Sequence, residues 1–125
     1  MFYTGKHVLA IWDGFAESPG HALIVPKRHV ASWFEASEEE RAEILKTIDI
    51  VRAAIVEEHA PDGYNVGLND GAHAGQTILH LHLHVIPRYA GDVPDPRGGI
   101  RHVIPDKAAY CKHQFIDFAK GRLPE

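Results

Sequence analysis

Apolar residues and histidines alternate one by one from Leu79 to Val85, and this period of two is the feature that most limits how the chain folds. Successive side chains of a β-strand point to opposite faces, so the alternation predicts a strand from Thr77 to Ile86. Its core face is expected to hold Leu79, Leu81, Leu83 and Val85, and its outer face Ile78, His80, His82, His84 and Ile86. Three imidazoles should therefore converge on one small volume.

The rest of the chain carries signals for three more strands and a long helix. Ser37, followed three residues later by Glu40, is a capping box, and the apolar residues after it recur at helical spacing. A helix is therefore predicted from about Glu38 to His59. The other predicted elements are strands at His7–Asp13, His21–Lys27 and Tyr64–Asn69, a short extended piece at Ile100–Ile104, and a closing helix at Asp106–Lys120.

The order of these elements predicts an α+β fold with an antiparallel sheet, one long helix and a C-terminal helix. The connection between the third and fourth strands is too short for a parallel crossover, which is why the sheet is expected to be antiparallel. At 125 residues the chain fits a single domain spanning residues 1–125.

Composition excludes several classes of function. The chain has 13 basic and 17 acidic residues and a net charge of -4, so no broad electropositive face for a long nucleic acid is expected. The N-terminal residues contain neither a secretory signal nor an apolar run of membrane-spanning length, which predicts a cytoplasmic protein without a membrane partner. Cys111 is the only cysteine, so neither an intramolecular disulfide nor a cysteine-built zinc site is expected.

Residue chemistry alone leaves three interpretations of the histidines open. They are solvated side chains of an edge strand, although the leucines between them indicate a strand that is held against a core. Alternatively, they bind a transition metal, with His21, His73, Asp70 or Asp92 as further ligands. In the third interpretation, a neutral imidazole attacks an activated phosphorus atom while its neighbours supply protons and stabilise charge.

The run from His80 to Ile86 fits the pattern His-φ-His-φ-His-φ-φ, in which φ is an apolar residue. By this pattern the chain resembles the histidine-triad (HIT) superfamily of nucleotide hydrolases and transferases. The stretches "SPGHALIVPKRHV", "GLNDGAHAGQT" and "PRYAGD" resemble the same family, the last of them its fragile-histidine-triad branch. The resemblance covers the chain from about Val8 to Asp106.

This resemblance implies a two-step reaction on a nucleoside 5'-phosphate that carries a leaving group. By position in the motif, His82 would be the nucleophile and would form a covalent nucleotidyl-histidine (phosphohistidine) intermediate that water then hydrolyses. His84 would hydrogen-bond the phosphate or the leaving group. His80, together with His21, would form the network that holds His82 in the reactive tautomer.

The resemblance also implies residues that contact the substrate. Asp13 would accept hydrogen bonds from the ribose hydroxyls. Asn69, Gln76 and Thr77 would contact the phosphate or the bridging oxygen as uncharged donors, and Gly75 would let the backbone approach the phosphate. The base pocket would be formed by Leu9, Ile11, Leu23 and Val25.

Two departures from the family refine these expectations. The uridylyltransferase and phosphorylase branches carry glutamine at the third triad position, and His84 in its place favours hydrolysis by water. Many relatives also have an N-terminal strand and a cysteine pair that binds structural zinc. This chain is expected to lack both, which excludes a structural metal and leaves the N-terminal edge of the sheet bare. Because edge strands need cover, a twofold homodimer is expected.

The resulting expectation is a cytoplasmic, homodimeric nucleotide hydrolase that acts on dinucleoside polyphosphates such as diadenosine polyphosphates, with adenine as the base. No cofactor is expected for the covalent step, although Mg²⁺ would accompany a polyphosphate substrate. Three alternatives stay open. They are a purine nucleoside phosphoramidase of the same superfamily, a histidine-based metal-binding protein or metalloenzyme, and a nucleotide-binding protein whose catalysis is vestigial.

Overall fold

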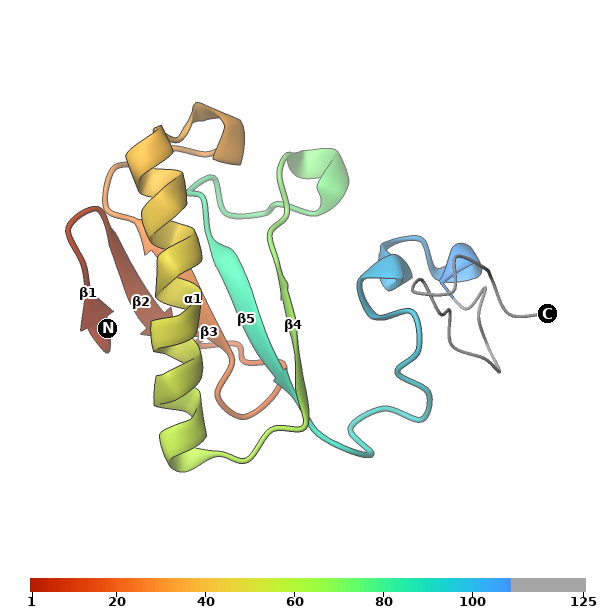
Figure 1. Cartoon of the computed structure of the whole chain (residues 1–125). Helices are drawn as coiled ribbons and strands as arrows, with labels where there is room; N and C mark the ends of the chain where they lie inside the picture. The colour runs from red at the N-terminus through yellow and green to blue at the C-terminus, as the bar shows by residue number, and fades with distance from the viewer. Residues whose placement is uncertain (109–125) are drawn as a thin grey trace, which may run out of the picture. The chain divides into compact units, whose positions relative to one another are not determined.

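The computed structural model describes residues 1–108 (Figure 1). The chain divides into two compact units, Met1–Ala90 and Gly91–Glu125. The first unit contains a five-stranded sheet and one long helix. The described part of the second unit contains two short 3-10 helices, Gly99–Val103 and Pro105–Lys107. The predicted α+β fold is confirmed, whereas a single domain over residues 1–125 stays a prediction.

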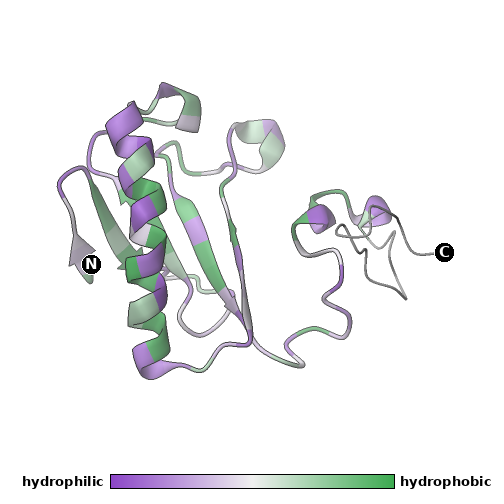
Figure 2. Ribbon diagram, viewed as in Figure 1, coloured by the Kyte–Doolittle hydropathy of each residue, from purple (hydrophilic) through white to green (hydrophobic). Residues whose placement is uncertain are grey.

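The sheet has the strand order β1-β2-β3-β5-β4, and every neighbouring pair is antiparallel. Buried and half-buried residues alternate along β2, β3 and β5, as expected for strands with one face on a core. Along β5, a hydrophilic band lies between hydrophobic ones (Figure 2). The strands are β1 Tyr3–Thr4, β2 Val8–Trp12, β3 Ala22–Pro26, β4 Gly63–Gly67 and β5 Leu83–Arg88.

Helix α1, Glu38–Glu58, covers one face of the sheet and packs on β2, β3 and β5. Its N-terminus is closed by the predicted capping box: the Ser37 hydroxyl accepts from the Glu40 backbone, and the Glu40 carboxylate accepts from the Ser37 backbone. Ile44, Val51 and Ile55 are fully buried against the sheet. Because the helix takes up one face, functional side chains on the central strands must project from the other.

The predicted strand from Thr77 to Ile86 is wrong in its first half, because β5 begins only at Leu83. The Lys27 amide donates to the carbonyl of His7, which immediately precedes β2, so alternate residues of β3, including Pro26, direct their nitrogen towards β5. Proline has no N–H to donate, and the β3–β5 ladder therefore stops short of it. The Leu81 amide instead donates to the Val30 carbonyl.

Three further expectations need correction. Leu79, predicted to face the core, is 65% exposed because it precedes the strand. Ile100–Ile104 is not extended, since its first four residues lie in the 3-10 helix Gly99–Val103. The N-terminal sheet edge is not bare, because the short β1 pairs with β2, and a two-residue strand is too short to leave a sequence pattern.

The closing helix predicted at Asp106–Lys120 lies mostly outside the described residues. Its first residues belong to the 3-10 helix Pro105–Lys107. No helix within residues 1–108 combines the length and the apolar character that crossing a bilayer requires.

Candidate active site

The predicted histidines of the site lie in or next to β5 and β3. His84 lies in β5, and its partner in the antiparallel register is Leu23 of β3. His21 immediately precedes β3 and is 2% exposed. The residues expected to line a base pocket are half-buried on the face of the sheet that carries His84: Leu9, Ile11, Leu23 and Val25.

Although His80 and His82 precede β5, the alternation of burial continues through them. Leu81 and Leu83 are buried, while the three histidines are half-buried. The rings of His82 and His84 lie with their centroids 5.1 Å apart. The three histidines therefore do share the open face, but the chain before Leu83 is held there by individual hydrogen bonds and not by a strand ladder.

His82 has a ring nitrogen whose protonation is fixed by the backbone. Its Nδ1 lies 2.8 Å from the carbonyl oxygen of His80. A carbonyl oxygen can only accept, so Nδ1 carries the proton in the neutral ring and Nε2 carries a lone pair. His82 is half-buried. Its Nε2 therefore has the electronic character of a nucleophile.

His84 receives the opposite tautomer through His21. The Glu17 backbone amide donates to Nδ1 of His21 at 3.0 Å, so the neutral His21 ring carries its proton on Nε2. This Nε2 lies 2.9 Å from Nδ1 of His84 and donates to it. The neutral His84 ring must then carry its own proton on Nε2. Adjacent rings thus present a lone pair at His82 and an N–H donor at His84.

Asp13, at the end of β2, approaches the same pair. Its Oδ2 lies 3.4 Å from Nε2 of His21, and its Oδ1 accepts from the Phe15 amide. Burial lowers the pKa of His21, and the charges of Asp13 and Glu17 oppose this. Burial, followed by His82 and His21, also lowers the pKa of His84. Both rings are therefore neutral near pH 7.

His21 bonds His84 and not the His82 ring that His21 and His80 are expected to orient together, and the ring of His80 also bonds elsewhere. Its Nε2 donates to the Pro26 carbonyl at 2.8 Å, and its Nδ1 lies 3.4 Å from Nδ1 of His29. Its contact with His82 is made by its backbone carbonyl. The His80 ring thus satisfies the Pro26 carbonyl, which lies beyond the end of the β3–β5 ladder, while the His80 carbonyl determines the tautomer of His82.

The loop between β4 and β5 is ordered by polar side chains. Gln76 is 7% exposed, and its amide bonds three backbone groups: it accepts from Gly71 and donates to Ala31 and Ile78. A substrate contact at Gln76 would compete with these bonds. Asn69 is half-buried, whereas Thr77 is exposed.

Two further residues of this region have defined conformations. The Asp70 carboxylate accepts from the Ser32 hydroxyl and the Trp33 amide, which ties the loop to the segment before α1. Gly75 has a φ of 96°, in the left-handed region that favours glycine. A Cβ atom at Gly75 would meet no atom within 4 Å, and the approach of a phosphate to this backbone stays a prediction.

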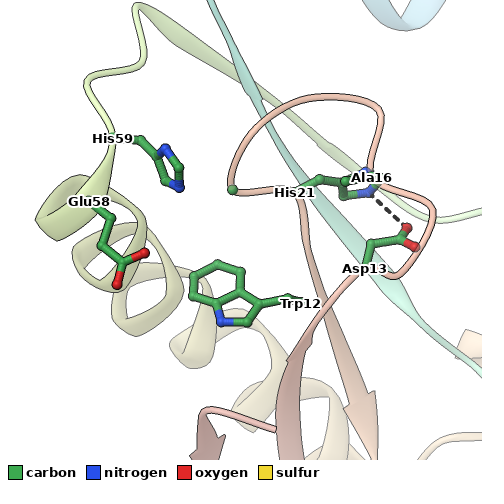
Figure 3. A pocket seen from close by; sticks show the side chains of 7 residues that line it. Trp12, Asp13, Ala16, His21, Glu58 and His59 are labelled. Carbon is green, nitrogen blue, oxygen red and sulfur yellow. Dashed lines mark ion pairs between the residues drawn. The ribbon is translucent and has the colours of Figure 1, made fainter.

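A cavity of about 200 Å³ lies beside His21 (Figure 3). Asp13 and His21 form one side of it, Glu58 and His59 from the end of α1 face them, and Trp12 lies between. The cavity contains neither His82 nor His84 among its lining residues. It therefore reaches the back of the His21–His84 pair and not the nucleophilic nitrogen.

Within residues 1–108, three potential metal ligands come together at Asp13, His21 and His84, with ligand atoms within 4.8 Å of one another. Nε2 of His21 would have to lose its proton to bind an ion. That proton would move to Nδ1, where it would face the Glu17 N–H. The hydrogen-bond arrangement therefore fits a donor chain better than a metal centre.

Some groups that contact the histidines have no recognisable pattern in the sequence. The Glu17 amide and the carbonyls of Pro26 and His80 are backbone groups, and any residue type supplies them. His29 was part of the "PKRHV" stretch, but no role was assigned to it. His29 and His80 are 51 residues apart in the sequence, and only the fold brings their rings together.

Residues 1–91 match the model of the HIT domain. The chain belongs to the HIT domain family. A Bacillus anthracis HIT family protein of known structure is 39% identical and superimposes with a TM-score of 0.68, over 72% of this chain and 64% of that one. The predicted HIT-like fold is thereby confirmed.

Two curated relatives of this HIT domain bear the names of nucleotide enzymes. A Mycobacterium tuberculosis protein named AP-4-A phosphorylase is 38% identical over 89 residues, covering 70% of this chain and 46% of the relative. A Saccharomyces cerevisiae protein named bis(5'-adenosyl)-triphosphatase is 37% identical over 90 residues, covering 71% and 44%. This chain spans less than half the length of either relative.

Proposed function

We propose that this HIT protein hydrolyses a dinucleoside polyphosphate and releases a nucleoside 5'-monophosphate through a covalent intermediate on His82. The observation that carries the proposal is the bond from Nδ1 of His82 to the His80 carbonyl, which leaves Nε2 unprotonated. The half-burial of His82 and the N–H donor on adjacent His84 support it. The names of the two nucleotide-enzyme relatives support the substrate class.

In the first step, Nε2 of His82 attacks the α-phosphorus and forms a P–N bond, while the bond from phosphorus to the bridging oxygen breaks. The leaving phosphate takes the electron pair. The His82 ring becomes cationic, and its Nδ1–H stays on the His80 carbonyl, which stabilises that charge. The Nε2–H of His84 donates to the developing negative oxygen.

In the second step, water attacks the phosphorus, and the P–N bond breaks with its electron pair returning to Nε2. The water proton leaves to solvent, so the products are the nucleoside monophosphate and the regenerated ring. Hydrogen bonds to the neutral donors Asn69 and Thr77, together with the Gly75 backbone, are proposed to hold the phosphate. Asp13 is proposed to accept from the ribose hydroxyls with the Oδ2 that faces His21.

The decisive experiment uses a dinucleoside polyphosphate labelled at the α-phosphorus and quenches the reaction early. Wild-type protein should carry an acid-labile, base-stable label, and His82→Ala should carry none. His7→Ala is the matched control, because His7 precedes β2 at the end opposite Asp13. Equal labelling of the wild type and His82→Ala would disprove the covalent step.

Product analysis separates the proposed hydrolase from its alternatives. A hydrolase forms nucleoside monophosphate regardless of added phosphate, whereas a phosphorylase forms nucleoside diphosphate in proportion to phosphate. A phosphoramidase prefers a P–N leaving group over a polyphosphate.

The role of metal ions is tested with a chelator. The covalent step is proposed to need no cofactor, and Mg²⁺ is proposed to accompany only the polyphosphate. A nucleoside phosphoramidate, which carries no polyphosphate, should therefore show any turnover unchanged in EDTA. Abolition by EDTA and recovery with a transition metal would instead establish the metal-dependent alternative.

The homodimer is also part of the proposal. Strand β4 is an outer strand of the sheet, and the described residues leave its second edge unpaired. Pairing of this edge with a second copy would satisfy its backbone groups. Sedimentation at micromolar concentration should give twice the mass of 13.9 kDa. A single species at the monomer mass would contradict the dimer.

A further inference from the structure

The turn from Glu17 to Gly20 is held to the rest of the fold by contacts that the sequence analysis did not assign. The Ser18 hydroxyl donates to the Pro87 carbonyl at 2.6 Å. The Tyr89 hydroxyl donates to the Pro19 carbonyl. Two side-chain hydroxyls thus connect this turn with the C-terminal end of β5, the strand that carries His84.

Glycine is required at the end of the same turn. Gly20 has a φ of 88°, and a Cβ atom there would lie 3.0 Å from Cδ2 of His59 and 3.2 Å from Cγ2 of Ile55. The end of α1 therefore packs directly on the backbone that leads into His21. Between β5 on one side and α1 on the other, the turn has little freedom to move.

The position of this turn decides the protonation of two rings. As long as the Glu17 amide points at Nδ1 of His21, a proton on Nδ1 would place two N–H groups against each other. His21 must therefore donate from Nε2, and His84 must accept at Nδ1. The Nε2–H of His84, which the proposed reaction uses, therefore depends on the Glu17 amide through two successive hydrogen bonds.

We infer that Ser18 and Tyr89 are positioning residues for the reaction, because they hold the Glu17 amide against His21 and thereby fix His84 as a neutral N–H donor. This role rests on the proposed function, since it serves the donor that faces the phosphate. Neither residue contacts His82, His84 or His21 through its hydroxyl. Their effect passes through the turn.

Several titratable groups face the pair and enter its titration. Asp13 and Glu17 approach from the end of β2 and from the turn, and His82 precedes β5. Glu58 and His59 face His21 across the cavity from the end of α1. Glu17 belongs to the turn, so its amide and its charge are expected to shift together when a hydroxyl that holds the turn is removed, while the other groups lie on other elements.

The test combines imidazole ¹⁵N NMR with kinetics on Ser18→Ala and Tyr89→Phe. In the wild type, His21 and His84 should both show the Nε2–H tautomer, and His82 the Nδ1–H tautomer. In either variant the tautomers of His21 and His84 should become mixed, while that of His82 stays unchanged. The NMR result needs no turnover, so it stands or fails separately from the proposed hydrolysis.

Kinetics should show a loss in kcat with little change in KM. One lost hydrogen bond to the turn is expected to lower kcat about three- to tenfold, and the acid side of the kcat profile should move to higher pH. The movement follows because a freed Nδ1 of His21 accepts a proton more easily. Tyr64→Phe is the matched control, since the Tyr64 hydroxyl is buried without a hydrogen-bond partner in residues 1–108.

Unchanged tautomers in both variants would overturn the inference, as would an equal kinetic loss in Tyr64→Phe. A loss confined to KM would also overturn it, because that result indicates a binding contact. Thermal unfolding checks that each variant is folded at the assay temperature. If Tyr89→Phe unfolds, Ser18→Ala decides the question alone, because its hydroxyl holds the same turn from β5.

Discussion

Two buried polar clusters of this HIT domain treat charge in opposite ways. At the start of α1, Arg28 bonds both carboxylate oxygens of Glu40, at 2.7 and 3.2 Å, and Glu40 is 4% exposed. This hydrogen bonding holds the pKa of Glu40 at about 2. In the second cluster, the His21–His84 pair, burial lowers the pKa of both rings and keeps them neutral.

The difference teaches that burial alone does not determine protonation. Glu40 keeps its charge because a guanidinium and the Ser37 amide satisfy its oxygens. His21 stays neutral because burial lowers its pKa against the opposing charges of Asp13 and Glu17. The Arg28–Glu40 ion pair stabilises the start of α1, whereas the neutral histidine pair leaves His84 as an N–H donor for the proposed reaction.

The largest expected effect separates the clusters by activity. His84→Ala removes the proposed donor to the phosphate and should lower kcat by roughly 10²-fold or more. Glu40→Gln should leave kcat within about twofold, because it touches no group of the site. Steady-state kinetics on a dinucleoside polyphosphate measures both. A similar loss in Glu40→Gln would mean that the two clusters are coupled.

The next largest effect is expected on the free energy of unfolding, to which the Arg28–Glu40 cluster should contribute. Glu40→Gln weakens the contact with Arg28 and should lower the free energy of unfolding by roughly 1–3 kcal/mol. Glu39→Gln, in the same first turn but exposed, should change it by less than about 0.5 kcal/mol. Urea unfolding gives both values. Equal effects at the two positions would show that the ion pair adds nothing beyond the helix dipole.

The pH dependence of stability should show two separate windows. Glu40 has a lowered carboxyl pKa, so its contribution is full above about pH 4.5 and is lost as the pH falls towards about 2. His21 and His84 have lowered pKa values, so only the unfolded state gains protons as the pH falls through about 6.5, and stability declines from there downward.

Variants assign each window of that profile. Glu40→Gln should remove the lower window only, and His21→Asn should reduce the upper one only. Unfolding at a series of pH values provides the measurement. If His21→Asn leaves the decline near pH 6.5 unchanged, another histidine of the chain causes it.

The smallest expected effect is that of salt. The Arg28 side chain is 57% exposed, so raising the ionic strength to about 1 M should weaken its interaction with Glu40 only slightly. The His21–His84 contact is neutral and should not respond. The measurement compares how the free energy of unfolding changes with salt concentration in the wild type and in Glu40→Gln. Identical salt dependences would show that screening does not affect the Arg28–Glu40 pair.

Local patterns predicted most of the framework. The Ser37 and Glu40 capping box placed the start of α1 at Glu38, and the predicted end at His59 lies one residue past the observed one. The apolar runs placed β2 and β3 within a residue at each end. These elements depend on neighbours within one turn or one strand, and such neighbours are visible in the sequence.

The first residue of β5 could not be predicted from the residues of that segment alone. The alternation from Thr77 onwards is a genuine strand pattern, yet the ladder begins at Leu83, because Pro26 has no N–H on the side that faces β5. The information that ends the strand lies more than 50 residues away. A periodicity analysis of one segment contains nothing about its partner.

The sequence by itself determined the antiparallel α+β framework, the histidine motif and the membership of the HIT family, because spacing and residue type carry that information. The tertiary structure alone decided which nitrogen of each histidine holds its proton. Those protons follow from a carbonyl at His80 and an amide at Glu17, and from the folding that brings His21 against His84. Backbone groups are the same in every residue, so their influence becomes visible only when the fold places them.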